Sequence, residues 1–435
     1  MTATEYDAVV VGGGFAGVTA ARELQHSGNR TLLLEGRDRL GGRTWTSDFG
    51  GQKVELGGTW VHWHQPHVWA EIKRYGLEVT ESPPPTLTGW LVGQELKQGP
   101  TEELWGLMTD STDRLCYDAR ERLERPHDPL HGNLADIDGL SIQDRVDELG
   151  FDREMQDVND GVWSTCSSAY LHETGLVAPL RWYALSGYSF QLMMDCIARY
   201  KIVTGTRSLV EAIAADGGFE IRYETPVAAV EQSGDAVAVR TRGGDTIEAR
   251  AAVVAVPVNS LGAIDFAPAL SDGKQSVAAE KQSSHGVKIW IRVRGEHDYL
   301  ATAPSTYGIT FLQSEYKIDG DTLFVSFGPD ASALDPEDKD AVARAAGEFF
   351  PNAEIVDSYA HNWTADEFAQ GTWCMFRPNQ LTGRLAELQE PEGSVYLATA
   401  DVADGWNGFI DGAIESGLTT ARKVTRALAG VSSAR

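Results

Sequence analysis

The chain has little basic charge, no paired cysteines and no long apolar run. Its 435 residues include 37 Lys and Arg against 63 Asp and Glu, a formal net charge of -26, which argues against nucleic acid or an anionic membrane as a partner. The four cysteines include no CxxC pair, so we expect neither a disulfide framework nor a zinc site. The N-terminus has no basic start, and no window reaches the roughly 18 apolar residues of a membrane span. We therefore expect a soluble, cytoplasmic protein without a metal.

A glycine motif near the N-terminus carries the strongest signal. Residues 8–11 are a uniformly apolar run, and an amphipathic segment and a second apolar run follow, which predicts a buried strand, a helix and another buried strand. Gly12, Gly14 and Gly17 have the spacing GxGxxG, which allows a tight turn, close approach to a pyrophosphate and packing of the helix on the strand. Glu35 ends the second run, where its carboxylate can bind a ribose diol. The pattern predicts a dinucleotide site.

The rest of the chain is long enough for a second domain. A proline-marked break, SPPPTLTG, begins at residue 82, and residues 101–200 have mostly helical patterning. Alternating runs between residues 220 and 256 predict β-hairpins that lead into a buried strand at 251–256. Further strands are expected at 286–295 and 322–328, a helix near 336–350, and a strand followed by a long amphipathic helix at the C-terminus.

Six blocks in order along the chain resemble the flavin-containing amine oxidase family, which includes the monoamine oxidases. They are GRDRLGGR, ELGGTW, TPVAAVEQSGDAVAV, VVAVP, GVKIWI and WNGFIDGAIESG. Among family members the chain looks closest to the bacterial hydroxynicotine oxidases. The resemblance implies an α/β fold, in which a Rossmann-like FAD-binding domain (1–75, 204–282 and 388–435) is interleaved with a substrate domain of mixed β-sheet and helices (76–203 and 283–387).

The resemblance also implies which residues bind FAD. Thr372 stands where members with covalent flavin have a cysteine, and Cys374 does not match that position, so we expect non-covalent FAD. The expected cofactor-binding residues are Gly12, Gly14, Phe15, Ala16, Gly17, Glu35, Gly36, Arg37, Gly42, Arg43, Gly58, Thr59, Trp60, Val227, Asp401 and Ile410.

Three residues are expected to act in catalysis. Lys288 alternates with an apolar face on its strand, and from spacing alone it fits a solvated strand face. The family keeps a lysine here that holds a water against flavin N5, where a positive charge would stabilise anionic flavin during reoxidation. Trp373 and Phe409 match the positions of an aromatic pair that faces the flavin, often two tyrosines. Such a pair would orient the lone pair of a neutral amine.

Four further residues are predicted to line the substrate space. They are His62, Trp163, Ser164 and Leu312. Ser164 stands where the hydroxynicotine oxidases have an asparagine and Leu312 where they have a tyrosine, so an apolar, aromatic or heterocyclic amine is expected rather than a particular pyridine alkaloid. The histidines of WVHWHQPH lack an acidic or cysteine partner set nearby in the sequence, so a loop beside the flavin is favoured over a metal site.

The predicted function is that of an FAD-dependent amine oxidase. A hydride would pass from the amine α-carbon to flavin N5, the imine would hydrolyse, and O₂ would be reduced to H₂O₂. Three alternatives remain: a desaturase of carbon–carbon bonds in a cyclic substrate, a dehydrogenase that uses a redox protein as acceptor, and a flavin-binding interaction protein without turnover. The combination of Lys288 with an aromatic pair argues against the last. A homodimer is left open.

Overall fold

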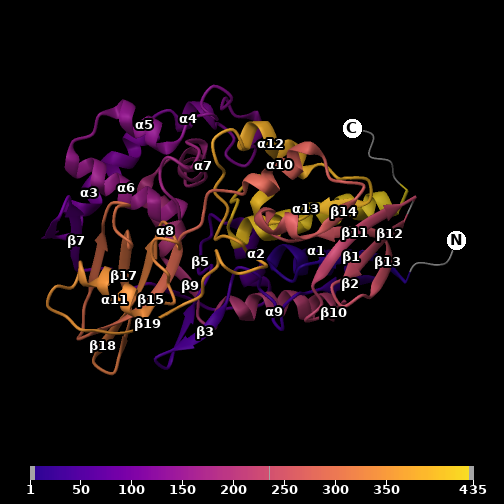
Figure 1. Ribbon diagram of the computed structural model, residues 1–435, viewed down its shortest axis with the longest axis horizontal. Helices are drawn as coiled ribbons and strands as arrows, with labels where there is room; N and C mark the ends of the chain where they lie inside the picture. Colours follow the sequence, from indigo (N-terminus) through magenta and orange to yellow (C-terminus); the bar gives the residue numbers. More distant parts are fainter. Residues whose placement is uncertain (1–4, 235, 431–435) are drawn as a thin grey trace.

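The computed structural model describes residues 5–234 and 236–430, and two large sheets lie towards opposite ends of its long axis (Figure 1). The first sheet has eight strands. Their order is β10 (Glu220–Arg222), β2 (Thr31–Leu34), β1 (Tyr6–Val11), β13 (Thr246–Val254), β12 (Ala236–Thr241), β11 (Val227–Ser233) and β14 (Asp265–Ala267), and β20 (Val395–Leu397) also pairs with β13.

The long strand β13 explains how a hairpin joins a parallel sheet. Its first half alternates between exposed and buried residues and pairs antiparallel with β12. Its second half is apolar and fully buried, and it pairs parallel with β1 on one side and β20 on the other. Alternation suits a strand with one wet face, and a continuous apolar run suits a strand covered on both faces. The change of pattern along β13 therefore marks its entry into the interior.

Helices cover the parallel part of this sheet. The helices α1 (Phe15–His26), α9 (Thr206–Gly217) and α13 (Ile410–Leu428) share one hydrophobic cluster with Ala8, Val10 and Val253. The alternate residues Val9 and Val11 belong to a cluster on the other face. Three further helices contact elements of this layer or one another. They are α2 (Pro66–Arg74), α10 (Asp272–Glu280) and α12 (Leu381–Gln389).

The second sheet is antiparallel except where β16 pairs with β7. Its order is β19 (Ile355–Ala360), β15 (Val287–Arg294), β18 (Asp321–Gly328), β17 (Phe311–Ile318), β16 (Tyr299–Thr302), β7 (Leu87–Val92) and β8 (Glu95–Gly99). One face packs against α11 (Lys339–Gly347). The other packs in the largest core with α3 (Thr101–Leu115), α4 (Ala119–Arg122), α5 (Ile142–Leu149), α6 (Arg153–Ser167), α7 (Val177–Leu185) and α8 (Phe190–Ala198).

Two small sheets complete the structure, and one of them joins distant segments. The hairpin β3 (Thr46–Phe49) and β4 (Gln52–Glu55) forms the first. In the second, β9 (Tyr200–Ile202) lies between β5 (Trp60–Val61) and β6 (Val79–Glu81). Because β5 follows the N-terminal nucleotide motif and β9 follows α8, this sheet connects the two large layers in the middle of Figure 1.

The strands keep to the segments from which the sequence predicts two domains. Every strand of the first sheet lies within 1–75, 204–282 or 388–435, and every strand of the second within 76–203 or 283–387. The domain boundaries themselves stay a prediction, which this division supports. The hairpin β7–β8 was not foreseen, because proline marked its start as a break. In the described part of the chain, no helix has the length and apolar character needed to cross a membrane.

Candidate active site

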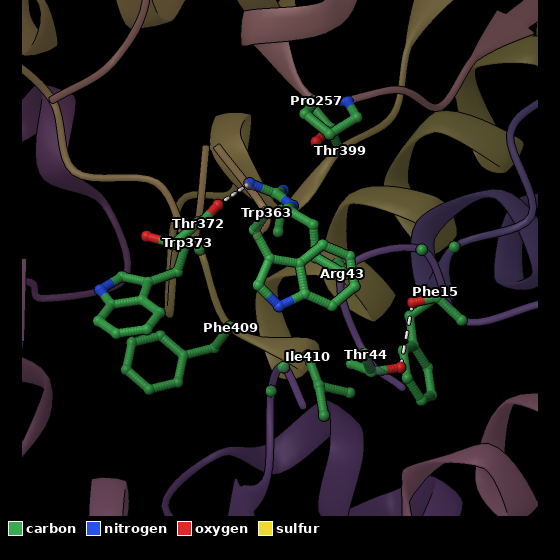
Figure 2. Close-up of a pocket in the computed structure, with 18 of the residues that line it drawn as sticks. Phe15, Arg43, Thr44, Pro257, Trp363, Thr372, Trp373, Thr399, Phe409 and Ile410 are labelled. Carbon is green, nitrogen blue, oxygen red and sulfur yellow. Dashed lines mark hydrogen bonds between the residues drawn. The ribbon is translucent and has the colours of Figure 1, made fainter. Parts of the chain in front are cut away.

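One cavity takes its lining from both large layers, and its two ends differ in make-up. Figure 2 shows part of this lining. We call the part lined by Gly12–Ala16, Glu35–Arg37 and Val227 the nucleotide end. We call the part lined by α3, α6, α7, α8, β17 and β18 the substrate end. The cavity brings together most of the residues predicted from the sequence, namely Gly12, Gly14, Phe15, Ala16, Glu35, Gly36, Arg37, Gly42, Arg43, Gly58, Thr59, Trp60, Val227, Lys288, Trp373, Phe409 and Ile410.

The nucleotide end begins with the turn between β1 and α1. Gly12 has φ of +107°, which disfavours other residues. A Cβ on Gly17 would lie 1.9 Å from the carbonyl oxygen of Gly12, so only glycine lets α1 pack this closely, although Gly17 itself does not line the cavity. The first turn of α1 has no side-chain cap and no acidic residue. Its N–H groups are therefore available to an anion.

Glu35 lies at the end of β2, beside this turn. One carboxylate oxygen accepts the backbone N–H of Gly13 at 2.6 Å and the other accepts that of Arg37 at 2.8 Å. Burial raises the pKa of Glu35, and the two backbone donors oppose that shift. The carboxylate is thus held in a fixed orientation, with lone pairs left over for a ribose diol.

Arg43 ties three distant segments together at the middle of the cavity. Its guanidinium donates to the Thr372 carbonyl at 2.8 Å and to the Asp401 carboxylate at 2.5 Å. The other oxygen of Asp401 accepts the backbone N–H of Val258. Asp401 is fully buried and lies behind the lining, so its place is to orient Arg43 and the Val258 backbone. A solvated surface arginine is excluded at position 43.

The described residues fit FAD at this end. A Cβ on Gly14 would meet no atom closer than 3.8 Å, so the backbone there borders open space. The hydroxyls of Ser260 and Thr372, both in the lining, are buried and have no hydrogen-bond partner among the described residues. Gly12–Phe15 and Arg43 would hold the pyrophosphate, and Glu35 the ribose.

Lys288 lies on β15 where the two ends meet. Lys288 is 3% exposed, so the solvated strand face that spacing alone suggested is excluded. The Nζ atom donates to the Gly57 carbonyl at 2.8 Å and to the Thr59 hydroxyl at 2.5 Å. Burial lowers the pKa of Lys288 to about 7, while Glu55 and Glu315 oppose that shift. An ammonium has three N–H donors, so one is left for the cavity.

Trp373 and Phe409 come from separate segments and lie at the same end of the cavity (Figure 2). Their backbones are neighbours, because the side chain of Asn407 donates to the Cys374 carbonyl. The Trp373 indole donates to the Cys166 carbonyl at 2.8 Å. The Phe409 ring makes an edge contact with Trp182 at 4.9 Å between centroids. Both rings are therefore held in place, while their role in catalysis stays a prediction.

The four predicted substrate-lining residues are absent from the lining, so that prediction needs correction. Leu312 points to the opposite face of its sheet and packs against α11, whereas its neighbours Phe311 and Gln313 line the cavity. Trp163 is buried in the core, and the Ser164 hydroxyl bonds back to the Asp160 carbonyl. His62 is buried against Cys196, and burial lowers its pKa to about 4.

His67 has a different environment from the one expected. It lies with Asp411 and Glu415, and ligand atoms of the three are within 4.8 Å of one another. Asp411 accepts the backbone N–H groups of His67 and Val68 and so caps α2. Glu415 accepts the backbone N–H groups of residues 404 and 405. Because backbone N–H groups hold both carboxylates, we interpret the group as a network that fixes the start of α2 and the loop at residues 404 and 405.

Several lining residues were missed from the sequence. At the nucleotide end they include Arg242 and Phe368, whose ring packs against both Arg37 and Arg242. At the substrate end the missed residues share one face of their helix or strand. Thr165 and Cys166 lie three and four residues after Val162 on a helix, and Gln313 lies two residues after Phe311 on a strand. The others at that end are Met108, Trp182, Met194, Ile197, Ala198 and Phe327.

Comparison with known proteins identifies the family. The family model described as flavin containing amine oxidoreductase matches residues 15–425. The chain belongs to this family. It is 42% identical to a pseudooxynicotine dehydrogenase of Pseudomonas sp. over 99% of this chain and 88% of that protein. It is 39% identical to the nicotine dehydrogenase of Pseudomonas putida (98% and 89%). Identity to the (S)-6-hydroxynicotine oxidase of Paenarthrobacter nicotinovorans is 29% (94% and 97%).

Solved structures of flavin amine oxidases have the same fold. Cyclohexylamine oxidase from Brevibacterium oxydans superposes with a TM-score of 0.81 at 21% identity, covering 98% of this chain and 99% of that one. Putrescine oxidase bound to putrescine gives 0.81 at 21% identity (96% and 98%). The predicted fold class, FAD as cofactor and amine oxidoreductase chemistry are thereby confirmed, and the alternative of a non-catalytic protein is removed.

Proposed function

We propose that this flavoenzyme oxidises a small apolar, aromatic or heterocyclic amine, bound as the neutral base. The observation that carries the proposal is the composition of the substrate end. Its lining is apolar and aromatic, with Thr165 and Gln313 as its uncharged polar side chains. Within the described lining, the carboxylates are those of Glu35 and Glu367, which belong to the nucleotide end. A cationic group on the far side of the substrate would therefore be buried without a partner.

Charge at the reacting position also favours the neutral amine. Lys288 lies where the two ends of the cavity meet, and its positive charge would repel a second ammonium there. The acidic surface of the molecule, with a net charge of -26, attracts protonated amines from solution. The amine would then lose its proton on entering the cavity.

The aromatic pair would set the pose of the substrate. Trp373 is fixed by its hydrogen bond to the Cys166 carbonyl, and Phe409 by its edge contact with Trp182. Rigid ring faces orient an apolar amine without offering a side chain that competes for the hydride. When bound, FAD accepts a hydride from the amine α-carbon and passes the electrons to an acceptor, O₂ giving H₂O₂, while the imine hydrolyses in water.

FAD would be held without a covalent bond. Thr372 occupies the lining and cannot form a thioether. Cys374 is buried outside the lining, and burial raises the pKa of its thiol well above the usual value. The neutral thiol is a poor nucleophile. Acid precipitation should therefore release all the flavin into the supernatant, and colour in the pellet would contradict this.

A second candidate differs in the electron acceptor. Two relatives at 42% and 39% identity are named dehydrogenases, which favours a redox protein in place of O₂. The desaturase alternative has less support, because no carboxylate or histidine of the described lining lies at the substrate end to remove a β-proton.

The test is an anaerobic screen of an amine panel with flavin absorbance as the readout. Bleaching by apolar or aromatic amines supports the proposal, and bleaching by cyclic ketones or alkenes alone would favour the desaturase. Admitting air and measuring H₂O₂ then separates the acceptors. Fast return of the colour with stoichiometric peroxide indicates an oxidase, and slow return indicates a dehydrogenase.

A further inference from the structure

A second cavity lies behind the wall that carries Lys288. Its lining includes Glu55, Thr59, Lys201, Trp290 and Tyr316. It reaches solvent at Lys53, Thr80 and Val203, which are exposed. The proposed function involves only the main cavity and assigns no role to this second one.

Thr59 is the residue that the two cavities share. Its hydroxyl accepts a hydrogen bond from Lys288 Nζ at 2.5 Å and donates to the Gly57 carbonyl at 3.1 Å. Thr59 is 5% exposed and lines both cavities, so it separates the two spaces. A hydroxyl can accept one proton while it gives up another. Thr59 can therefore connect Lys288 with the second cavity.

Four charges are buried around this wall. Lys201 forms an ion pair with Glu315, and both side chains are almost fully buried. The Glu55 carboxylate accepts from the backbone and hydroxyl of Thr206. Glu55 and Glu315 favour the charged form of Lys288, and Lys201 disfavours it. Two cations and two anions thus act on one another in a low-dielectric region, where such interactions are strong.

A β-bulge lies at Glu315, one of these four charged residues. The pairing of β17 with β18 shifts between Ser314 and Tyr316, so Glu315 has no partner residue across the strands. Before the bulge Phe311 and Gln313 face the cavity, and after it Tyr316 faces the same side and lines the second cavity. If the pairing continued without this shift, Glu315 would take that side and Tyr316 would turn towards α11. One oxygen of Glu315 is buried with no hydrogen-bond partner among the described residues.

We infer that the second cavity is a proton port for Lys288, with the Thr59 hydroxyl as the link. The hydroxyl gives its proton to the neutral Lys288 amine while it takes one from water in the second cavity, so that one proton moves inward and no electron is transferred. Loss of a proton from Lys288 follows the reverse path. The inference rests on the proposed function only in placing Lys288 beside the flavin.

Such a port has a physical use. An apolar amine bound at the substrate end excludes water from the main cavity. Reduction of O₂ to H₂O₂ by a flavin that has received one hydride consumes one proton. Lys288 can supply that proton and be recharged from the other side of the wall while the main cavity is still closed by product.

The test uses the oxidised holoenzyme without substrate. The absorbance of the bound flavin reports a charge change at Lys288, so a stopped-flow pH jump across pH 7 gives the rate of proton exchange. Lys288→Met should abolish the absorbance change and so assign it. In Thr59→Val the exchange should slow roughly tenfold or more. Thr59→Ser should restore it because the hydroxyl returns.

A second arm leaves the wall intact and closes the mouth of the port. The four native cysteines are buried, so a single introduced cysteine can be labelled. Val203→Cys modified with a bulky maleimide should slow the exchange by a similar factor. Tyr117→Cys is the matched control, because Tyr117 is exposed and lines neither cavity, and it should leave the rate unchanged.

The outcomes separate the port from the proposed function. Slower proton exchange in Thr59→Val and in the blocked Val203→Cys protein supports the port. This holds even if the wild-type absorbance change is already complete within the mixing time, because the slowed change in the variants can still be followed. Wild-type rates in both proteins overturn it, as does an absorbance change that persists in Lys288→Met. Failure of every amine to bleach the flavin would overturn the proposed function instead, because the pH jump needs no substrate.

Discussion

The nucleotide end and the substrate end of the main cavity are built in different ways. At the nucleotide end, the backbone of one continuous segment, residues 12–16, makes the contact surface, and Glu35 lies one strand further on. At the substrate end, side chains from α3, α6, α7, α8, β17, β18 and two C-terminal loops meet, and these elements are spread over the sequence. The first end depends on glycines that leave room, and the second on side chains that fill it.

This difference explains why one end is easier to recognise than the other. FAD is the cofactor of the family, so the backbone geometry at this end follows from a short motif. Substrates differ, and side chains can be exchanged without altering the helices and strands that carry them. Substitutions should therefore affect cofactor binding at one end and reaction rate at the other.

The largest expected effect is at the nucleotide end. Gly14→Ala should weaken FAD binding roughly a hundredfold or more, about 3 kcal/mol, because the new methyl group occupies space that the pyrophosphate needs. The unfolding free energy of the flavin-free protein should change by less than about 1 kcal/mol, since a Cβ meets no protein atom within 3.8 Å. Flavin titration and thermal unfolding measure the two.

Gly106→Ala is the matched control, because Gly106 lies within α3 and a Cβ there meets no neighbouring atom. It should leave FAD affinity unchanged and stabilise the helix slightly. Loss of stability in Gly14→Ala together with normal FAD affinity in the folded fraction would show that the glycine serves packing alone.

The next effect concerns charge at the substrate end. The panel amine that reduces the flavin fastest should do so roughly a hundredfold faster than its analogue with a second ammonium at the far end, because that ammonium would be buried unpaired. Gln313→Glu introduces a carboxylate of the same shape in the lining. This substitution should reduce the difference between the flavin reduction rates with the two amines. Anaerobic reduction rates for the two amines decide it, and an equal rate in the wild type would refute the apolar assignment.

At the junction of the two ends, Lys288→Met should slow reoxidation of the reduced flavin by O₂ roughly tenfold to a hundredfold. FAD affinity should change much less, because the lysine contacts Gly57 and Thr59 and not the pyrophosphate turn. Lys339→Met, on the exposed side of α11, is the control. Wild-type reoxidation in Lys288→Met would remove the lysine from the mechanism.

The same lysine should give a pH dependence of stability. Its pKa falls from 10.5 to about 7 on burial, so between these values the unfolded chain binds a proton that the folded chain does not. The unfolding free energy of the flavin-free protein therefore gains a component that rises with pH in this window. Relative to wild type, Lys288→Met should gain most in Tm below about pH 7 and least near pH 10.

The smallest effect on the reaction rate is expected for the aromatic pair, and Trp163 serves as a control for Trp373. Trp373→Ala should lower the rate of flavin reduction roughly tenfold, with a modest loss of stability because Trp373 is half-buried beside the cavity. Trp163→Ala should cost roughly 3 to 5 kcal/mol and leave reduction per folded molecule unchanged, since that ring lies in the core. Phe409→Tyr should be tolerated.

Reduction rates and thermal melts on the same samples separate the two tryptophans. A Trp373→Ala protein with wild-type reduction rates and a strongly lowered Tm would make it a packing residue like Trp163.

The errors at the substrate end have a common physical origin. Leu312 lies one residue from Phe311 and Gln313, and a shift of one position turns a strand residue to the other face. Trp163 lies one residue from Val162, and one position rotates a helix residue by about 100°. The sequence resemblance placed the correct helix and strand at the cavity, but it did not determine which face of each points into the cavity.

The sequence by itself determined the strand, glycine turn and helix that begin the chain, the acid at the end of β2, and the strand that carries Lys288, because these depend on local periodicity and backbone freedom. Only the tertiary structure decided that Lys288 is buried, that Arg43 joins Thr372 to Asp401, and that a bulge at Glu315 turns Tyr316 towards a second cavity behind Thr59. The contacts of Lys288 and Arg43 join segments more than 200 residues apart in the sequence, and burial and charge there depend on all of the neighbours together.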